Sequence, residues 1–78
     1  MKVYETDEVI EYLKSRRIIK PYLKSKQYFE LGYKQLINLK ILKPKKNQLY
    51  QFRITKKYRA IGYFKENGFL VIEISDHQ

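Results

Sequence analysis

The feature that most constrains the fold of this chain is the alternation of apolar and polar side chains over its last thirty residues. Three segments, 49–54, 58–64 and 69–74, are rich in tyrosine, phenylalanine and isoleucine and are separated by short polar stretches. Such segments are typical of β-strands. Asn67 and Gly68, between the second and third segments, form the pair that favours a two-residue hairpin turn. The sequence therefore predicts three antiparallel strands joined in a meander.

The residues before this meander predict one more strand and two helices. Residues 2–5 have the composition of a short strand, and Thr6 or Asp7 then provides the N-cap of a helix. Apolar residues recur at helical spacing in two stretches, with Val9, Ile10 and Leu13 in the first and Tyr22, Phe29, Leu36 and Leu39 in the second. Pro21 ends the first helix or opens the second, and Pro44 ends the helical region.

The expected order of elements is β-α-α-β-β-β. Because the helices are grouped before the three meander strands, the order favours an α+β fold. In this fold a helical hairpin packs on one face of a small, mainly antiparallel sheet. The chain has 78 residues with no internal repeat and no linker composition, so we expect a single domain that spans 1–78.

The residue types that are rare or missing exclude several classes of site. There is no cysteine, and His77 is the sole histidine, so the set of about four ligands that zinc prefers is missing. The three glycines form no phosphate-binding loop, and the serines lie in no nucleophile-elbow motif. We therefore expect neither a metal ion nor a small-molecule cofactor.

The hydropathy of the chain indicates where it acts. Mean hydropathy is −0.62, and no apolar run approaches the roughly 18 residues that a membrane span requires. The first residues lack the apolar stretch of a signal peptide. We therefore expect a soluble, cytoplasmic protein with no membrane partner.

Basic residues are concentrated in the middle of the chain. The formal net charge is +9, and residues 14–57 hold fourteen lysines and arginines against one acid, Glu30. Such an asymmetric distribution is typical of proteins that bind nucleic acid or an acidic protein. Part of this charge lies in the connector 43–48, which contains Lys45 and Lys46. The distribution therefore favours a polyanionic partner.

Strand alternation predicts which meander side chains share a face. The more apolar set is expected to face the helices: Tyr50, Phe52, Ile54, Phe64, Leu70, Ile72 and Ile74. The opposite, open face then carries Gln51, Arg53, Arg59, Tyr63, Glu73 and, if the last strand continues, His77. Arginine recognises phosphate in a planar, bidentate manner and aromatic rings stack on bases, so this face is suited to nucleic acid. Two alternatives stay open from the residues alone: Arg53 or Arg59 pairs with Glu73 across the sheet, and His77 is a solvated surface residue.

The segment Leu49-Tyr50-Gln51-Phe52-Arg53-Ile54, the short basic turn after it, and Tyr58-Arg59-Ala60-Ile61 together resemble the core of the RelE/ParE superfamily of toxins. These toxins belong to type II toxin–antitoxin systems. Members typically carry a strand of the form Y-x-h-R/K-h followed by a strand that opens with Tyr-Arg. The order of helices and strands also matches, so the resemblance covers nearly the whole chain. Its ending, Ser75-Asp76-His77, is most similar to the HigB-type branch.

The resemblance implies a ribosome-dependent mRNA endoribonuclease that is held inactive by a cognate acidic antitoxin. Its partners are then the ribosome, mRNA and the antitoxin. In such an enzyme a ribose 2′-OH attacks the adjacent phosphate, which requires a base, cations for the developing charge, and a proton donor. By position, Arg59 is the main cation on the phosphate and Arg53 is a second. His77 is the acid or base, because the ordinary histidine pKa of about 6.5 allows both roles.

The same resemblance assigns further residues to RNA binding. Lys56 and Lys57 of the basic turn are expected to bind the RNA backbone, as are Lys45 and Lys46 of the connector. Tyr63 is expected to stack on a base. Gln51 is expected to contact RNA beside the arginines, and Asp76 to orient His77 or a nucleotide.

The sequence also departs from the family pattern in two places. Many members carry a further catalytic tyrosine or arginine beyond the last strand, a position that this sequence does not contain, and Gln51 stands where lysine is frequent. Two alternative functions therefore stay open. One is a ParE-like, non-enzymatic toxin that inhibits DNA gyrase, and the other is a catalytically weak relative that binds only RNA or an antitoxin.

Overall fold

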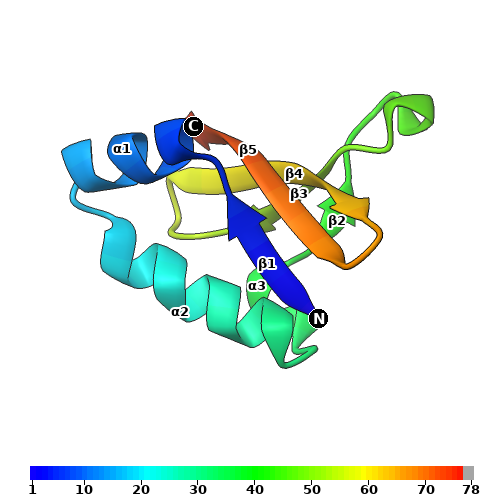
Figure 1. Ribbon diagram of the computed structural model, residues 1–78, viewed down its shortest axis with the longest axis horizontal. Helices are drawn as coiled ribbons and strands as arrows, with labels where there is room; N and C mark the ends of the chain where they lie inside the picture. Colours follow the sequence, from blue (N-terminus) through cyan, green and yellow to red (C-terminus); the bar gives the residue numbers. More distant parts are fainter. Residues whose placement is uncertain (77–78) are drawn as a thin grey trace.

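The computed structural model describes residues 1–76 of the chain. The elements follow in the order β1 (Lys2–Glu5), α1 (Asp7–Ser15), α2 (Ile19–Glu30), α3 (Lys34–Ile37), β2 (Lys40–Ile41), the 3₁₀ helix η1 (Lys45–Asn47), β3 (Tyr50–Arg53), β4 (Tyr58–Lys65) and β5 (Gly68–Asp76). The strands form one sheet in the order β1-β5-β4-β3-β2, in which β1 pairs parallel to β5 and the other pairs are antiparallel (Figure 1). This arrangement confirms the predicted α+β fold. Within residues 1–76 no helix is long and apolar enough to cross a membrane.

The start of α1 is fixed by its N-cap. The hydroxyl oxygen of Thr6 accepts a hydrogen bond from the backbone N–H of Val9 at 3.1 Å, and Asp7 and Glu8 place negative charge in the first turn. Of the two predicted caps, Thr6 is therefore the one used. Pro21 lies in the first turn of α2, where its missing N–H interrupts no bond within the helix.

The predicted second helix is wrong in its length. It was expected to continue to Leu39, but α2 ends at Glu30 because Gly32 adopts a left-handed φ of 87° that reverses the chain. The short α3 follows and ends at Asn38, which is also left-handed. The chain then forms β2 before reaching Pro44, so the helical region ends earlier than the proline predicts. Two residues of strand are too few to give a readable alternation, which is why the sequence did not indicate β2.

The core lies between the helices and one face of the sheet. Its largest fully buried side chains are aromatic and come from α2, β3 and β5: Tyr22, Phe29, Phe52 and Phe69. The Phe29 ring meets those of Phe52 and Phe69 at centroid distances of 5.3 and 4.9 Å. Phe64 extends this cluster toward the solvent, since its ring contacts Phe29 although the residue is 40% exposed.

A β-bulge in β5 changes which of its residues face the core. Ile61 pairs with Glu73 and Gly62 pairs with Val71, so Ile72 is an extra residue without a partner on β4. Phe69 and Val71 are therefore fully buried, whereas Ile72 is exposed. The prediction that Leu70 and Ile72 face the helices is wrong. It assumed that side chains alternate without interruption back from Ile74, whereas the inserted residue reverses the faces of the residues before it.

The predicted hairpin between β4 and β5 is present, but its turn lies one residue earlier. Lys65 pairs directly with Gly68, so the two turn residues are Glu66 and Asn67. Gly68 belongs to β5, where a Cβ atom would collide with the carbonyl oxygen of Lys2. The glycine is therefore required by the close approach of β1 and not by the conformation of the turn.

Candidate functional site

The face of the sheet opposite the helices is the candidate site, and strand register divides it into three rows of neighbouring side chains. The arginine row contains Arg53, Arg59 and Ser75; the middle row contains Lys40, Gln51, Ile61 and Glu73; the tyrosine row contains Tyr63, Leu70 and Tyr4. Lys2 and Lys65 flank the tyrosine row through their pairings with Gly68. Arg53, Arg59, Gln51 and Tyr63 thus share one face, as their alternation predicts.

The two arginines lie directly opposite each other on neighbouring strands. Arg53 of β3 pairs with Arg59 of β4 in the antiparallel register, which places two positively charged residues at opposing positions on one face. The ion pairs among residues 1–76 are Lys26–Glu5 and Lys57–Asp76. The alternative in which Glu73 pairs with Arg53 or Arg59 is therefore wrong, and the arginine row is a concentration of positive charge without a carboxylate.

Arg53 is held in place through its backbone. Its carbonyl oxygen accepts a hydrogen bond of 2.9 Å from the hydroxyl of Ser25, a buried residue of α2. The bond ties the end of β3 to the helix layer, while the Arg53 side chain itself is exposed and makes no hydrogen bond to a described residue. The guanidinium is thus presented on an anchored strand end.

Arg59 has a structural contact that sequence reasoning did not predict. Its Nη1 donates to the backbone carbonyls of Thr55, Lys56 and Tyr58 at 2.6, 3.2 and 3.1 Å. These bonds close the turn between β3 and β4. Since a guanidinium has five N–H donors, the Arg59 side chain can hold this turn through Nη1 and still present Nε and Nη2 to a ligand.

The basic turn lies at the same end of the sheet as the arginine row. The Thr55 hydroxyl accepts hydrogen bonds from the backbone N–H groups of Lys57 and Tyr58, at 3.2 and 3.1 Å, which gives the turn a defined shape. Lys56 and Lys57 are exposed on it, and the Lys57 ammonium lies 3.8 Å from Asp76 and 5.4 Å from the centre of the Tyr58 ring. Two of the predicted RNA-binding lysines therefore adjoin the arginines.

Asp76 lies at this end but on the other side of the sheet. It pairs with Tyr58, whose ring is part of the core. The pKa of Arg16, the C-cap of α1, is raised chiefly by the neighbouring Tyr12 side chain and to a smaller extent by the Asp76 carboxylate. Asp76, which was predicted to orient a catalytic group, thus lies on the side of the sheet away from the arginine row. His77, the predicted acid or base, lies outside the described residues.

The other predicted lysines are not part of this cluster. Lys45 and Lys46 belong to η1, which stands out from the sheet at the end opposite to α1 and the last residues of β5 (Figure 1). The structure therefore brings Lys56 and Lys57 to the arginine row and separates Lys45 and Lys46 from it.

Among the basic and aromatic residues of the open face, four were not predicted as site residues: Lys2, Tyr4, Lys40 and Lys65. The ring of Tyr4 lies beside β5, and the Lys65 ammonium is 5.2 Å from its centre. The alternation of residues 2–5 is the signal that could have found Lys2 and Tyr4, because Val3 is buried and its neighbours point the other way. Lys40 was not expected on a strand, because the helical region was expected to continue to Pro44.

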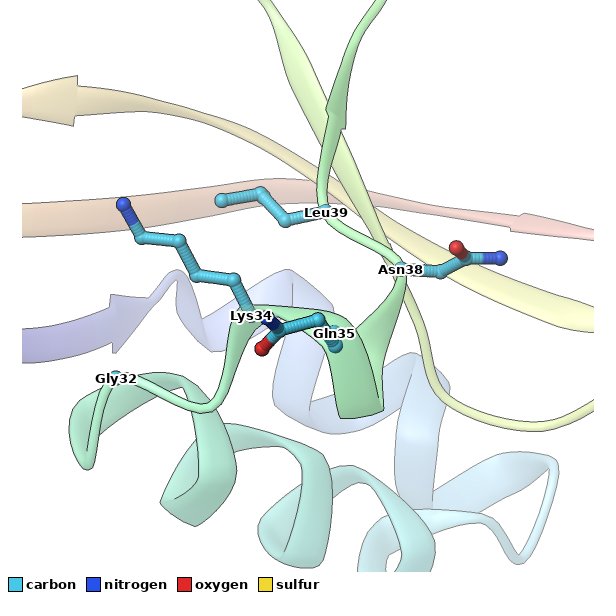
Figure 2. A pocket seen from close by; sticks show the side chains of 5 residues that line it. All are labelled: Gly32, Lys34, Gln35, Asn38 and Leu39. Atoms are coloured by element: carbon cyan, nitrogen blue, oxygen red, sulfur yellow. The ribbon is translucent and has the colours of Figure 1, made fainter.

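A surface hollow of about 540 Å³ lies away from the arginine row. Gly32, Lys34, Gln35, Asn38 and Leu39 line it, and Figure 2 shows the Lys34 and Leu39 side chains extending in the same direction while Asn38 points away from them. It holds no group of acids, and nowhere in residues 1–76 do three potential metal-binding side chains gather. No residue of the arginine row lines this hollow.

No protein-family model and no curated protein matches this sequence. Among solved structures, a YoeB/ParE toxin from Agrobacterium tumefaciens is similar, with a TM-score of 0.63 and 17% sequence identity. The match covers 100% of this chain and 100% of that one. The likeness is one of three-dimensional arrangement, since so few residues are identical. Over its whole length, this chain therefore shares the fold of a YoeB/ParE toxin.

Proposed function

We propose that this chain is the toxin of a type II toxin–antitoxin system and that it blocks translation as a ribosome-dependent mRNA endoribonuclease. Two observations support the proposal: the fold shared with a YoeB/ParE toxin, and the register that places Arg53 opposite Arg59 on an open face. The second observation carries it. Like charges directly opposite each other destabilise a sheet, and a bound phosphate between two guanidinium groups reverses this effect.

The reaction that fits this face is an internal transfer at phosphorus. The 2′ oxygen of a ribose bonds to the adjacent phosphorus, and the bond from phosphorus to the 5′ oxygen of the next nucleotide breaks. One proton leaves the 2′-OH and one reaches the departing oxygen, so the products are a 2′,3′-cyclic phosphate and a free 5′-hydroxyl. The phosphoryl oxygens gain negative charge in the transition state, which fixed cations stabilise.

In this proposal the arginines act on the phosphate and the turn lysines act on its neighbours. Arg53 and Arg59 take the scissile phosphate between strands β3 and β4. Lys56 and Lys57, on the adjoining turn, bind flanking phosphates or ribosomal RNA. His77 keeps its expected role as acid or base, and the likeness of Ser75-Asp76-His77 to the HigB-type branch remains part of the proposal.

The cognate antitoxin is expected to be acidic and partly disordered. A chain with a net charge of +9 attracts such a segment over long distances, which accelerates association, while apolar contacts supply most of the lasting affinity. Covering the arginine row would then block RNA and silence the toxin.

Primer extension on a defined mRNA in a reconstituted translation reaction tests the proposal. The wild type is compared with Arg53→Gln and His77→Ala, each with and without ribosomes. Lys20→Gln is the matched control, because it removes one exposed positive charge from α2, on the helix side of the molecule. We expect ribosome-dependent cuts within the codon of the ribosomal A site that persist in Lys20→Gln and disappear in Arg53→Gln. Absence of cuts from the folded wild type would contradict the nuclease.

Arg53 is a cleaner test than Arg59, because Arg59 also holds the turn between β3 and β4. An Arg59→Gln variant therefore needs its thermal stability measured beside its activity. Loss of cleavage with an unchanged melting temperature assigns Arg59 to the phosphate, whereas loss of both assigns it to the turn.

That same contact favours a second candidate function, a ParE-like toxin that inhibits DNA gyrase without catalysis. The Nη1 donors of Arg59 are already bonded to backbone carbonyls. Asp76 faces the other side of the sheet, so Glu73 is the only carboxylate in the rows of the described open face. Inhibition of gyrase supercoiling by the wild type, together with intact mRNA in the translation reaction, would establish this candidate in place of the nuclease.

A further inference from the structure

The tyrosine row crosses three strands in direct register. Tyr63 of β4 pairs with Leu70 of β5, and Leu70 pairs with Tyr4 of β1. Tyr63 and Tyr4 are 38% and 39% exposed, so both rings retain open surface. Neither ring contacts another aromatic ring of residues 1–76, in contrast to the clustered rings of the core. Two exposed tyrosines with an aliphatic side chain between them form an apolar platform on a face that is otherwise basic.

The backbone beneath Tyr4 is shaped to accommodate its ring. A Cβ atom on Gly68 would lie 3.3 Å from the Cε2 atom of Tyr4 as well as colliding with the backbone of β1. The Lys65 ammonium lies 5.2 Å from the centre of the same ring. The glycine thus leaves room for an aromatic side chain to lie on the sheet, with a positive charge beside it.

The charges of the open face specify the chemistry of an occupant. Cations stand at five of its positions, Lys2, Lys40, Arg53, Arg59 and Lys65, and the single carboxylate in its rows is Glu73. A partner therefore has to supply negative charge along its length and flat apolar groups at the tyrosine row. Single-stranded nucleic acid has both, because its phosphates alternate with bases whose faces are unpaired.

We propose that Tyr4, Leu70 and Tyr63 form a second RNA subsite, which stacks a base of the single strand whose phosphate lies at the arginine row. The substrate class in this inference rests on the proposed function. Tyr63 lies four positions after Arg59 along β4, which at about 3.3 Å per residue is about 13 Å. One strand of RNA running along β4 can therefore occupy both subsites, and the tyrosine row takes a flanking nucleotide.

The contact between Lys65 and Tyr4 is compatible with this role. A cation beside an exposed ring contributes less than a base stacked on it, so a base can displace the ammonium from the ring. The displaced ammonium then lies next to the phosphate of the stacked nucleotide. Lys65 thus contributes a salt-dependent interaction, while the tyrosines contribute one that depends little on salt.

Fluorescence anisotropy with an end-labelled single-stranded RNA of about eight nucleotides tests the inference without ribosomes. Tyr63→Leu and Tyr4→Leu keep an apolar side chain and remove the stacking ring. Each is expected to weaken binding at least about fivefold, with the slope against salt concentration unchanged. Tyr33→Leu is the matched control, because Tyr33 is exposed next to α3 and lies on no row of the open face. Melting curves verify that all variants fold.

Lys65→Gln gives the complementary result. It is expected to weaken binding and to reduce the salt slope by about one unit, as for a single phosphate contact. Affinity that is the same in wild type, Tyr63→Leu and Tyr4→Leu overturns the subsite. The subsite is also overturned if double-stranded RNA binds as tightly as single-stranded RNA and its binding does not depend on the tyrosines. It is overturned as well if the protein binds an acidic peptide through the tyrosines and does not bind RNA.

This inference and the proposed function fail in different ways. If mRNA is cut in the translation reaction but the affinity for the oligonucleotide is the same with and without the two tyrosine rings, the nuclease stands and the second subsite is wrong. If affinity depends on both tyrosines but no mRNA is cut, the subsite stands and the nuclease is wrong. Single-stranded DNA of the same sequence, run in parallel, separates a nucleobase platform from one that also requires the ribose 2′-OH.

Discussion

The two faces of the sheet use charged residues in opposite ways. On the covered face, Glu5 of β1 accepts hydrogen bonds from the Tyr22 hydroxyl at 2.6 Å and from the Lys26 ammonium at 3.0 Å. Glu30 of α2 accepts the backbone N–H of Val3 at 2.8 Å. No buried side-chain nitrogen or oxygen in residues 1–76 is left without a partner. Each of these charges therefore joins β1 to α2.

On the open face, cations are placed next to one another. Arg53 lies opposite Arg59, and neither is among the ion pairs of residues 1–76. A charge in the interior must be paired because its desolvation is costly, whereas a charge on a wet face can remain unpaired until a ligand arrives. The comparison teaches that the covered face uses charge for stability, whereas the open face leaves its two arginines outside the ion pairs of residues 1–76, as the proposed function requires.

The largest expected effect comes from removing a charge of the open face. Arg53→Gln should reduce mRNA cleavage about a hundredfold or more, the usual loss when a fixed donor to a developing oxyanion is removed. Its side chain makes no hydrogen bond to a described residue, and the substitution removes a like charge opposite Arg59, so the melting temperature should stay the same or rise slightly. Cleavage rates and melting curves of one preparation measure both quantities. A variant that cleaves normally but melts early would reverse the comparison between the two faces.

Removing a charge of the covered face should have the opposite result. Glu5→Ala leaves the Tyr22 hydroxyl and the Lys26 ammonium without their acceptor, and we expect the free energy of unfolding to fall by about 1–3 kcal/mol. Chemical denaturation measures this loss, and Glu11→Ala, an exposed acid of α1, is the control. Cleavage per folded molecule should be unaffected. A Glu5→Ala protein as stable as the control would show that the covered charges are not structural.

The sequence predicted this division of the sheet in part. Alternation assigned Arg53 and Arg59 to one face and Phe52 to the other, because β3 and the first half of β4 run without interruption. In β5 the same reasoning placed Ile72 in the core, since an inserted residue leaves no mark in the composition of a strand. Alternation thus predicts faces reliably only between bulges.

Other features depend on contacts between distant residues. The approach of β1 to Gly68, which creates the position of Tyr4, joins segments at opposite ends of the chain. The bonds of Arg59 to its turn follow from a side-chain conformation that no residue spacing predicts. The resemblance to toxin sequences indicated the fold. The structure in addition shows that Arg53, Arg59 and the turn lysines lie at the same end of the sheet.

The hydrogen bond between Tyr22 and Glu5 on the covered face also predicts that stability responds to alkaline pH. Burial, followed by the hydrogen bond to Glu5, raises the pKa of Tyr22 well above its ordinary value of about 10. As the pH rises past that value, the unfolded chain releases the phenolic proton first, so stability is intact below about pH 10 and falls above it. Tyr22→Phe should cost about 1 kcal/mol at neutral pH and reduce this alkaline loss. Denaturation at neutral pH and above pH 10 measures both, and an identical alkaline loss in the variant would assign it to other groups.

The smallest effect is expected at the rim where the two faces meet. Lys57 and Asp76 are 3.8 Å apart with both side chains well exposed, and such pairs contribute about 0.5 kcal/mol or less. Asp76→Asn should therefore leave stability almost unchanged. Because Asp76 pairs with Tyr58 and not with an open-face residue, cleavage should also stay within about twofold of wild type. A large loss of cleavage at constant stability would instead support the predicted orienting role of Asp76. In that case the carboxylate at the end of β5 would belong with the proposed binding charges of the open face and not with the structural charges of the covered face.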